Sequence, residues 1–310
     1  MPSTSADRQA RLQAIRTSGR PALYDGAKGV FLSPRLADVG KTPSDLTEWL
    51  NLLAPETVRQ AHRDYIEAGS DIIQTNSFSG NRFQLEQRGL VSRLQELNLA
   101  AAEIAREAAD DQALVAGDLG PSGKLLAMGE VSREALAEAF AEQARALDEG
   151  GVDFFHVETI SDLEEAIAAV AGIRSASRLP VAVTMSFDSG KAERGLRTMM
   201  GVSAGQLAEK ARELGLFGVG ANCGRDLEGY QTVIRQLTES AGQAVVIAKL
   251  NTGLPQIRDG QVHYAGTPEE MAAYALWCAR QGVGIIGGCC GSTPAHIAAM
   301  AGALAREGLR

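Results

Sequence analysis

Apolar and polar positions along the chain alternate between two kinds of segment. Short, almost continuously apolar runs predict strands that are buried on both faces, as in a parallel sheet. Longer segments rich in Ala, Glu, Leu and Arg, with apolar residues three and four positions apart, predict amphipathic helices between those strands. The eight strand candidates are residues 22–26, 71–75, 113–118, 153–158, 181–187, 218–223, 244–249 and 284–287.

The helix candidates make the pattern a repeated strand-helix unit, which favours a closed (β/α)8 barrel over an open doubly wound sheet. An open sheet would need a GxGxxG phosphate loop after its first strand, but residues 25–29 read Asp-Gly-Ala-Lys-Gly. We expect one α/β domain, a TIM barrel of residues 21–310, preceded by residues 1–20 as a docking helix or a frayed arm. The clearest helices are residues 133–147, 163–173, 206–214, 268–280 and 295–304, with Ser132, Ser161, Ser203 and Thr267 as predicted caps.

Composition narrows the class of protein. The chain has 310 residues, 45% of them hydrophobic, and a net charge of −8 without a basic stripe, so nucleic acid is not an expected partner. No apolar run is long enough to span a bilayer, and the N-terminus lacks the apolar core of a signal peptide. We therefore expect a cytoplasmic protein with no membrane partner. Its oligomeric state stays open, a homo-oligomer included.

Polar side chains gather at the C-terminal ends of the predicted strands, where (β/α)8 barrels build their active sites. This clustering favours an enzyme over a scaffold. The long connection of residues 31–54 would cover the same end of the barrel. The polar strand-end positions are Asp25, Gln74, Thr75, Asn76, Asp118, Glu158, Ser186, Asp188, Asn222, Cys223, Lys249, Asn251, Cys289 and Cys290.

Three thiols stand out among these positions. Cys223 ends the sixth strand, while Cys289 and Cys290 follow the eighth within a Gly-Gly-Cys-Cys-Gly run. Residues of one layer on alternate strands point inward together, so the three thiols can share an ion. Three thiolates suit Zn²⁺ with one open position, which would hold a substrate thiol as a thiolate. A vicinal disulfide would need strained geometry and an oxidising setting, and Cys278 reads as a buried apolar residue.

The other strand-end residues have weaker signals. Asp25 and Glu158 could bind a substrate ammonium, or could simply cap helices or face solvent. His156 shares a strand face with Glu158 and is expected to be packed or hydrogen-bonded rather than a metal ligand. Trp49, on the long first connection, is either a loop anchor or a cation–π contact for a methylated cationic donor. The roles of Asp118, Asp188 and His156 stay open.

Several motifs, taken in order, are similar to those of one family. They are residues 25–27, 68–78, 157–159, 220–223 and 287–291, and the last two are the most specific. On these residues the chain resembles the homocysteine S-methyltransferase family, which includes betaine-homocysteine methyltransferases and the homocysteine-binding module of cobalamin-dependent methionine synthase. The match looks closest to bacterial betaine-homocysteine methyltransferases, through residues 48–51 and 198–201.

The resemblance implies a zinc-dependent (β/α)8 barrel. It also implies that two carboxylates hold the homocysteine amino group and that backbone amides contact its carboxylate. The chain departs from relatives at Lys28-Gly29-Val30 and at Thr252, both near the barrel mouth. The implied zinc ligands are Cys223, Cys289 and Cys290. The amino-group ligands are Asp25 and Glu158, the carboxylate contacts are near Gly26, Ala27, Gln74 and Thr75, and Asn222 is assigned to the same pocket.

The expected reaction is zinc-dependent methyl transfer to L-homocysteine, giving L-methionine, with betaine or another small onium compound as donor. One alternative is a homocysteine-activating subunit that takes the methyl group from methylcobalamin on a separate corrinoid protein. A second is a non-catalytic zinc- or thiol-binding barrel. Hydrolytic zinc chemistry would prefer His or Asp ligands and a general base beside the metal, which the sequence does not clearly offer.

Overall fold

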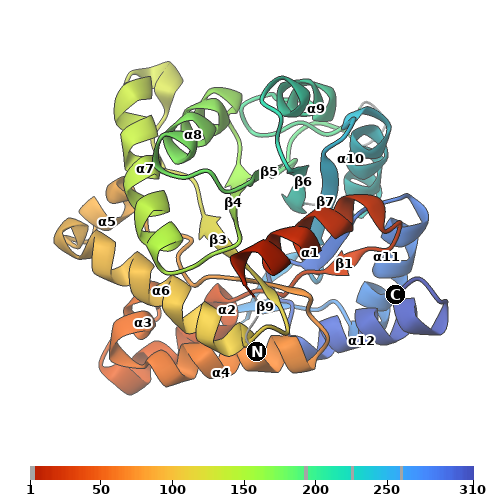
Figure 1. The fold of residues 1–310 in the computed structure, drawn as a ribbon, viewed down its shortest axis with the longest axis horizontal. Coiled ribbons are helices and arrows are strands. Elements are labelled where there is room, and N and C mark those ends of the chain that lie inside the picture. The colour runs from red at the N-terminus through yellow and green to blue at the C-terminus, as the bar shows by residue number, and fades with distance from the viewer. Residues whose placement is uncertain (1–3, 192–194, 225–226, 259–260) are drawn as a thin grey trace.

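The computed structural model describes residues 4–191, 195–224, 227–258 and 261–310. In this part of the chain, eight parallel strands run in the order β1-β10-β7-β6-β5-β4-β3-β2, and a parallel bridge from Tyr24 to Ile72 joins the two ends (Figure 1). The predicted (β/α)8 barrel is therefore confirmed. Its strands are β1 (Ala22–Leu23), β2 (Ile72–Gln74), β3 (Leu114–Leu119), β4 (Phe154–Ile160), β5 (Val181–Met185), β6 (Gly218–Cys223), β7 (Val245–Leu250) and β10 (Ile285–Gly288).

Helices surround the strands, and their starts follow capping chemistry. Ser132, Ser203 and Thr267 accept backbone hydrogen bonds as N-caps, as predicted. Ser161 does not cap its helix, because Asp162, one residue nearer, accepts from Glu164 N instead. The outer helices are α4 (Pro55–Glu67), α6 (Leu94–Ala109), α7 (Arg133–Glu149), α8 (Leu163–Ala176), α9 (Ala204–Glu213), α10 (Leu227–Ser240), α11 (Pro268–Arg280) and α12 (Pro294–Arg306).

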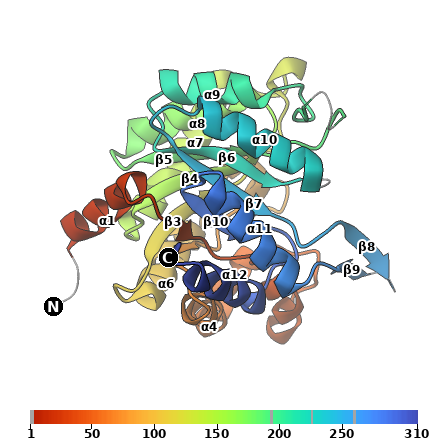
Figure 2. The ribbon, with the colours of Figure 1, turned by 90° about the vertical axis from the view of Figure 1, so that its right-hand side faces the viewer.

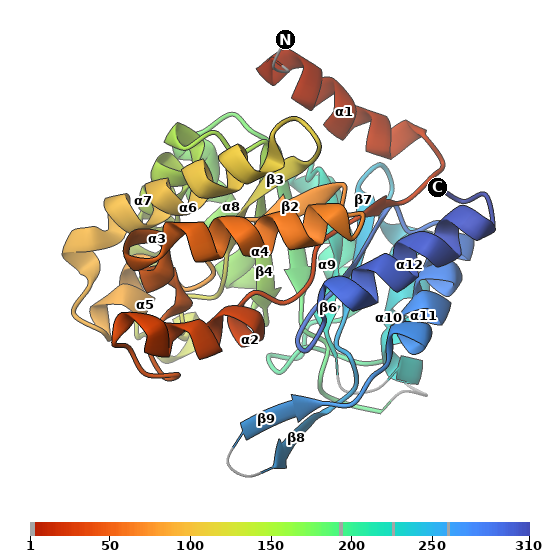
Figure 3. The same cartoon turned by 90° about the horizontal axis from the view of Figure 1, so that it is seen from below.

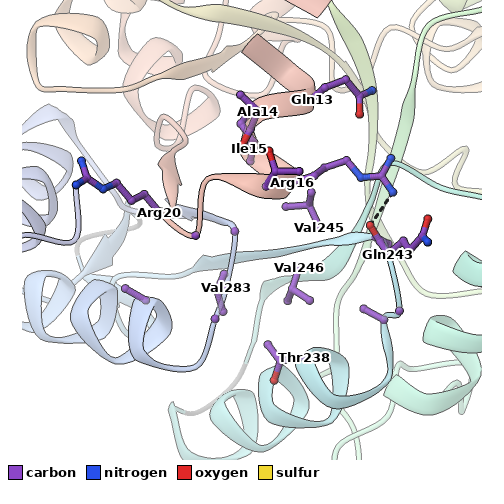
Figure 4. Close-up of a pocket in the computed structure, with 18 of the residues that line it drawn as sticks. Gln13, Ala14, Ile15, Arg16, Arg20, Thr238, Gln243, Val245, Val246 and Val283 are labelled. Carbon is purple, nitrogen blue, oxygen red and sulfur yellow. Dashed lines mark hydrogen bonds between the residues drawn. The ribbon is translucent and has the colours of Figure 1, made fainter. Parts of the chain in front are cut away.

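The N-terminal segment forms helix α1 (Ser5–Thr17), which covers the N-terminal ends of the strands (Figure 3). Leu12 is fully buried in the barrel interior, a contact that contributes about 2 kcal/mol. Arg8 Nε lies 2.7 Å from Asp153 Oδ1, and Arg16 donates to Gln243 O across a cavity of about 1020 Å³ (Figure 4). Thr4 caps this helix, and residues 1–3 lie outside the described residues.

The opposite end of the barrel carries two additions. The long first connection contains α2 (Gly29–Leu32), η1 (Ser33–Val39), η2 (Thr47–Trp49) and α3 (Leu50–Leu53). Between β7 and α11, the strands β8 (Pro255–Arg258) and β9 (Gln261–Tyr264) pair as an antiparallel hairpin that projects from the barrel (Figure 2). Further short elements are α5 (Arg82–Glu86), η3 (Val91–Arg93) and η4 (Leu126–Met128). Throughout the described ranges, each helix is too short or too polar to cross a bilayer.

Candidate metal centre and substrate cavity

Three cysteine side chains meet at the C-terminal ends of β6 and β10. Cys223 is the last residue of β6, and Cys289 and Cys290 directly follow β10. The Sγ atoms of Cys223 and Cys289 lie 3.2 Å apart, and all three Sγ atoms lie within 4.8 Å of one another. Sulfur ligands on a tetrahedral Zn²⁺ stand roughly 3.8 Å apart. The three thiols therefore fit a single soft ion that leaves one coordination position free.

Backbone conformation aims these thiols at one point. Cys223 has φ +63°, a left-handed conformation that costs on the order of 1 kcal/mol for a residue with a Cβ atom. Gly291, with φ +81°, closes the turn after the cysteine pair. A Cβ atom at Gly291 would collide with Thr252 Oγ1 and the Tyr264 ring, so the turn requires glycine.

Hydrogen-bond donors surround the sulfur atoms. Asn222 Nδ2 lies 3.6 Å from Cys223 Sγ and 3.8 Å from Cys289 Sγ. Hydrogen bonds from Cys223 and Cys289 lower the pKa of Cys290, which also accepts from Tyr264. Burial and the negative charge of Cys290 raise the pKa of Tyr264, so its phenol stays protonated as a donor. These donors favour the thiolate form of Cys290, whereas hydrogen bonds within the cluster and burial raise the pKa values of Cys223 and Cys289. The thiolate is the form that binds a metal.

The thiols form one wall of a cavity of about 360 Å³ at the mouth of the barrel. This volume falls in the usual range for small-molecule sites. Asp25 and Asn222 are fully buried just behind the lining, where each contacts a residue of the cavity wall. The lining includes the predicted residues Gly26, Ala27, Gln74, Thr75, Glu158, Cys223, Cys289 and Cys290.

Glu158 is held by a buried lysine. Lys249 Nζ lies 2.8 Å from Glu158 Oε2 and also donates to Gln74 Oε1. Burial opposes the charge on Glu158, but Lys249 and His156 outweigh it and lower the pKa of Glu158 to about 2. The same attraction outweighs burial at Lys249 and raises the pKa of its ammonium. Both groups are therefore charged at neutral pH. The sequence had indicated Lys249 only as a polar residue at a strand end, without this role.

Asp25 also has a lysine partner. Its Oδ2 accepts from Gln74 N at 2.9 Å and forms an ion pair with Lys28 Nζ, three residues along the chain. Its Oδ1 is buried and has no hydrogen-bond partner. A buried carboxylate oxygen without a donor is costly, so Asp25 offers a ready acceptor for a ligand cation.

His156 links the carboxylate region to the sulfur atoms and is not near a metal position. Thr184 Oγ1 donates to Asn222 Oδ1 at 2.7 Å, so it accepts from His156 Nε2 at 3.0 Å. Nε2 therefore carries the ring proton, and Nδ1 accepts from Tyr24 or Gln74. Burial lowers the pKa of His156 to about 3 despite nearby Glu158. The neutral ring thus orients the Asn222 amide toward the thiols, which fits the expected hydrogen-bonded role.

The backbone amides expected to bind a substrate carboxylate are largely engaged. Ala27 N donates to Ser292 Oγ at 3.0 Å, Gln74 N to Asp25, and Thr75 N to Ala116 O at 2.9 Å. Each of these three N–H groups could bind a carboxylate only by giving up its present acceptor. Ala27, Gln74 and Thr75 lie where they were expected, but their three backbone N–H groups are already hydrogen-bonded.

Three further residues had open roles. Asp118 lines the cavity with an unpartnered Oδ1, and burial together with Glu158 raises the pKa of its carboxyl well above the ordinary value. Asp188 is half-buried outside the cavity lining and accepts from Ser189 Oγ. Trp49 is likewise not among the described lining residues, and Lys41 Nζ sits 4.1 Å from its ring centroid. The structure therefore favours the loop-anchor interpretation of Trp49.

Comparisons with known proteins identify the family of this chain. The chain belongs to the homocysteine S-methyltransferase family, because the sequence model of that family matches residues 22–304. Methionine synthase of Mycobacterium tuberculosis is 31% identical over 297 residues, which cover 93% of this chain and 25% of that protein. Methionine synthase of Mycobacterium leprae is also 31% identical, over 93% of this chain and 24% of that protein. The chain thus spans about a quarter of the length of these curated relatives.

Solved structures support the same architecture. The metallated form of the homocysteine methyltransferase MmuM from Escherichia coli superimposes with a TM-score of 0.75 at 24% identity. The match covers 93% of this chain and 98% of that one. The oxidised form of the same protein gives a TM-score of 0.72 over 91% of this chain and 95% of that one, also at 24% identity. At this level of identity the likeness establishes the fold.

Proposed function

We propose that the chain catalyses zinc-dependent methyl transfer from a small onium compound, such as betaine, to L-homocysteine, giving L-methionine. One observation carries the proposal: three thiols within 4.8 Å of one another share a cavity of about 360 Å³ with paired carboxylates and lysines. Membership of the family and the metallated state named for the solved relative support it. Homocysteine has a thiol that could bind an ion held by the three cysteines. It also has an ammonium and a carboxylate that could pair with the charged side chains of the cavity.

Cys223, Cys289 and Cys290 would hold the ion. When bound, Zn²⁺ would supply Lewis acidity that keeps the homocysteine sulfur deprotonated at neutral pH. Asp25 and Glu158 would bind the ammonium, and the first connection would exclude water from the mouth. The sulfur lone pair then forms the S–CH3 bond, the methyl–nitrogen bond of the donor breaks, and its electron pair leaves with the amine. The thiol proton passes to solvent before transfer.

The barrel residues contribute alignment more than chemistry. Holding sulfur and methyl carbon in line removes the entropy cost of a bimolecular encounter, worth up to roughly 11 kcal/mol of the barrier. Asn222, fixed by Thr184 and Thr159, keeps the thiol wall in place. Residues distant from the methyl group therefore set the rate by setting geometry.

A donor screen tests the proposal. Zinc-loaded protein is incubated with L-homocysteine and trideuteromethyl-labelled betaine or S-methylmethionine, and labelled methionine is measured by mass spectrometry. Labelled product that disappears in the Cys290→Ala variant is the expected result. A protein that binds one zinc per chain but forms no labelled methionine with any donor offered would be a non-catalytic zinc barrel.

A second candidate takes the methyl group from a separate corrinoid protein. Among the described residues, the exposed large apolar side chains lie in connections that follow barrel strands or, for Leu227, at the start of the next helix, on the side of the barrel where the cavity opens. Such a ring suits a protein-borne donor better than a diffusible one. Labelled methionine formed only after a methylated corrinoid protein is added would favour this candidate. The side chains are Leu53, Phe78, Leu125, Met128, Met199, Met200, Leu227 and Leu254.

A further inference from the structure

The strand that carries Glu158 ends irregularly. Between Val157 and Ile160 the pairing of β4 with β5 shifts register, as at a β-bulge. Successive side chains of a regular strand point to opposite sides of the sheet. Glu158 and Thr159 nevertheless both line the cavity. The irregularity therefore turns Thr159 inward, beside the carboxylate proposed to bind the substrate ammonium.

Thr159 also has an unusual backbone conformation. Its φ is +63°, in the left-handed region that a β-branched residue rarely adopts. Such a conformation costs free energy and persists only where neighbouring contacts hold it. Here the contacts come from Asn222 of β6. Thr159 N donates to Asn222 Oδ1 at 2.9 Å, and Asn222 Nδ2 donates to Thr159 Oγ1 at 2.7 Å. The side-chain amide thus binds the left-handed residue at two points.

The same amide faces the thiols. Thr184 Oγ1, from β5, donates to Asn222 Oδ1 at 2.7 Å, so the amide oxygen has two donors. The amide NH2 has two hydrogens, one of which goes to Thr159. The nitrogen also lies 3.6 Å from Cys223 Sγ and 3.8 Å from Cys289 Sγ. Asn222 is fully buried, so water does not compete for these contacts. The bonds to Thr159 therefore help to set how the amide N–H meets the sulfur atoms.

We propose that Thr159 is a positioning residue of the metal centre, acting through Asn222. Its hydroxyl and left-handed backbone fix the amide, and the amide presents an N–H to the thiolates that would hold the ion. Such a donor offsets part of the charge of three thiolates and fixes their orientation. The inference rests on the proposed function, because it concerns the same three thiols. It gives Thr159 a task at the metal, although its neighbour Glu158 belongs to the amino-acid end of the cavity.

The zinc affinity of the reduced protein tests the inference without any turnover, by competition with a chromophoric chelator. Thr159→Val removes the hydroxyl, Thr159→Ser keeps it, and Thr159→Gly removes it while favouring the left-handed backbone. Thr198→Val is the matched control. Thr198 is also buried, its hydroxyl donates to Ser161 O at 2.6 Å, and it is not among the described residues that line the cavity. Cobalt-loaded samples give a second readout, the sulfur-to-cobalt charge-transfer bands.

We expect Thr159→Val and Thr159→Gly to weaken zinc binding about 10- to 100-fold and to shift the charge-transfer bands. Thr159→Ser and Thr198→Val should stay within a factor of about three of the wild type. If Thr159→Gly binds zinc as tightly as the wild type, the hydroxyl contact is not needed and the inference is refuted. Unchanged affinity and unshifted bands in Thr159→Val would refute it as well.

A double-variant cycle tests whether Thr159 acts through Asn222. Thr159→Val combined with Asn222→Ala should bind zinc no more weakly than Asn222→Ala alone, whereas losses that multiply would overturn the inference. The wild type separates this inference from the proposed function. If the wild type binds no zinc, the proposed function and the inference fail together. If it binds one zinc per chain and the Thr159 variants match it, only the inference fails. Circular dichroism establishes that each variant has folded.

Discussion

Replacing Lys249 with methionine measures how much the buried ion pair of Lys249 and Glu158 contributes to the free energy of unfolding. Lys249 is 2% exposed, and its ammonium is 2.8 Å from Glu158 Oε2. The pKa of Glu158 is held at about 2 instead of 4.5, which corresponds to about 3 kcal/mol of favourable interaction for its ionised form. Removing one partner of such a buried pair typically costs about 3–5 kcal/mol. We expect Lys249→Met to lower the free energy of unfolding at pH 7 by that amount.

The pH dependence gives the sign of the effect. In the wild type, Glu158 has a depressed pKa, so its contribution is full above pH 4.5 and is lost as the pH falls toward 2. In Lys249→Met, burial without the cation raises the pKa of Glu158. The variant is then penalised most at neutral pH and regains stability relative to the wild type on acidification, when the carboxyl binds a proton.

Urea unfolding at pH 7 and pH 5 measures both effects. The matched control is the double variant Glu158→Gln with Lys249→Met, which removes both charges and should be more stable at pH 7 than Lys249→Met alone. A single variant that loses less than about 1 kcal/mol would refute the reasoning. So would a gap from the wild type that does not narrow at lower pH.

Three other expectations concern the metal site and the core. Cys290→Ala should lose stoichiometric zinc, measured by atomic emission on dialysed protein, whereas Cys278→Ala should keep it, because Cys278 is buried in α11 away from the sulfur cluster. Gly291→Ala should lose zinc and several kcal/mol of stability, since its Cβ would collide with neighbours. Gly282→Ala, with φ +80° and open space, should cost only about 1 kcal/mol in thermal unfolding. Burial lowers the pKa of His156 to about 3, so between pH 6.5 and pH 3 only the unfolded chain binds the proton. The free energy of unfolding should therefore fall over this range. In urea titrations, a His156→Gln variant should show a shallower fall.

Hydrophobic periodicity was sufficient for the barrel. Parallel strands buried on both faces leave long apolar runs, so all eight strands were located, and the Pro268–Arg280 helix was predicted to the residue. The thiols were found because a barrel brings strand ends together and glycines flank the pair. The barrel topology therefore brings the thiols together, and their positions at predicted strand ends can be read from the sequence.

The contacts that the sequence did not predict are those whose partners are set only by the folded structure. Nothing in the sequence pairs Lys249 with Glu158 or assigns the acceptor of Ala27 N, because both contacts join segments far apart in the chain. The hairpin that brings Tyr264 to Cys290 was missed as well. Its signal is the Asp-Gly pair at residues 259–260, typical of a tight turn, which lies outside the described residues.

The distance along the chain between the sulfur ligands has its own consequence. Cys223 and Cys289 are 66 residues apart, and β7 with its hairpin and α11 lies between them. An ion shared by both would fasten the last quarter of the barrel to its middle, since it binds only when both segments are folded. Chelation should then loosen β7 to α12 before the first half, which amide exchange would resolve by segment. Cellular metal supply would in that case govern how much folded protein persists, in addition to how fast it works.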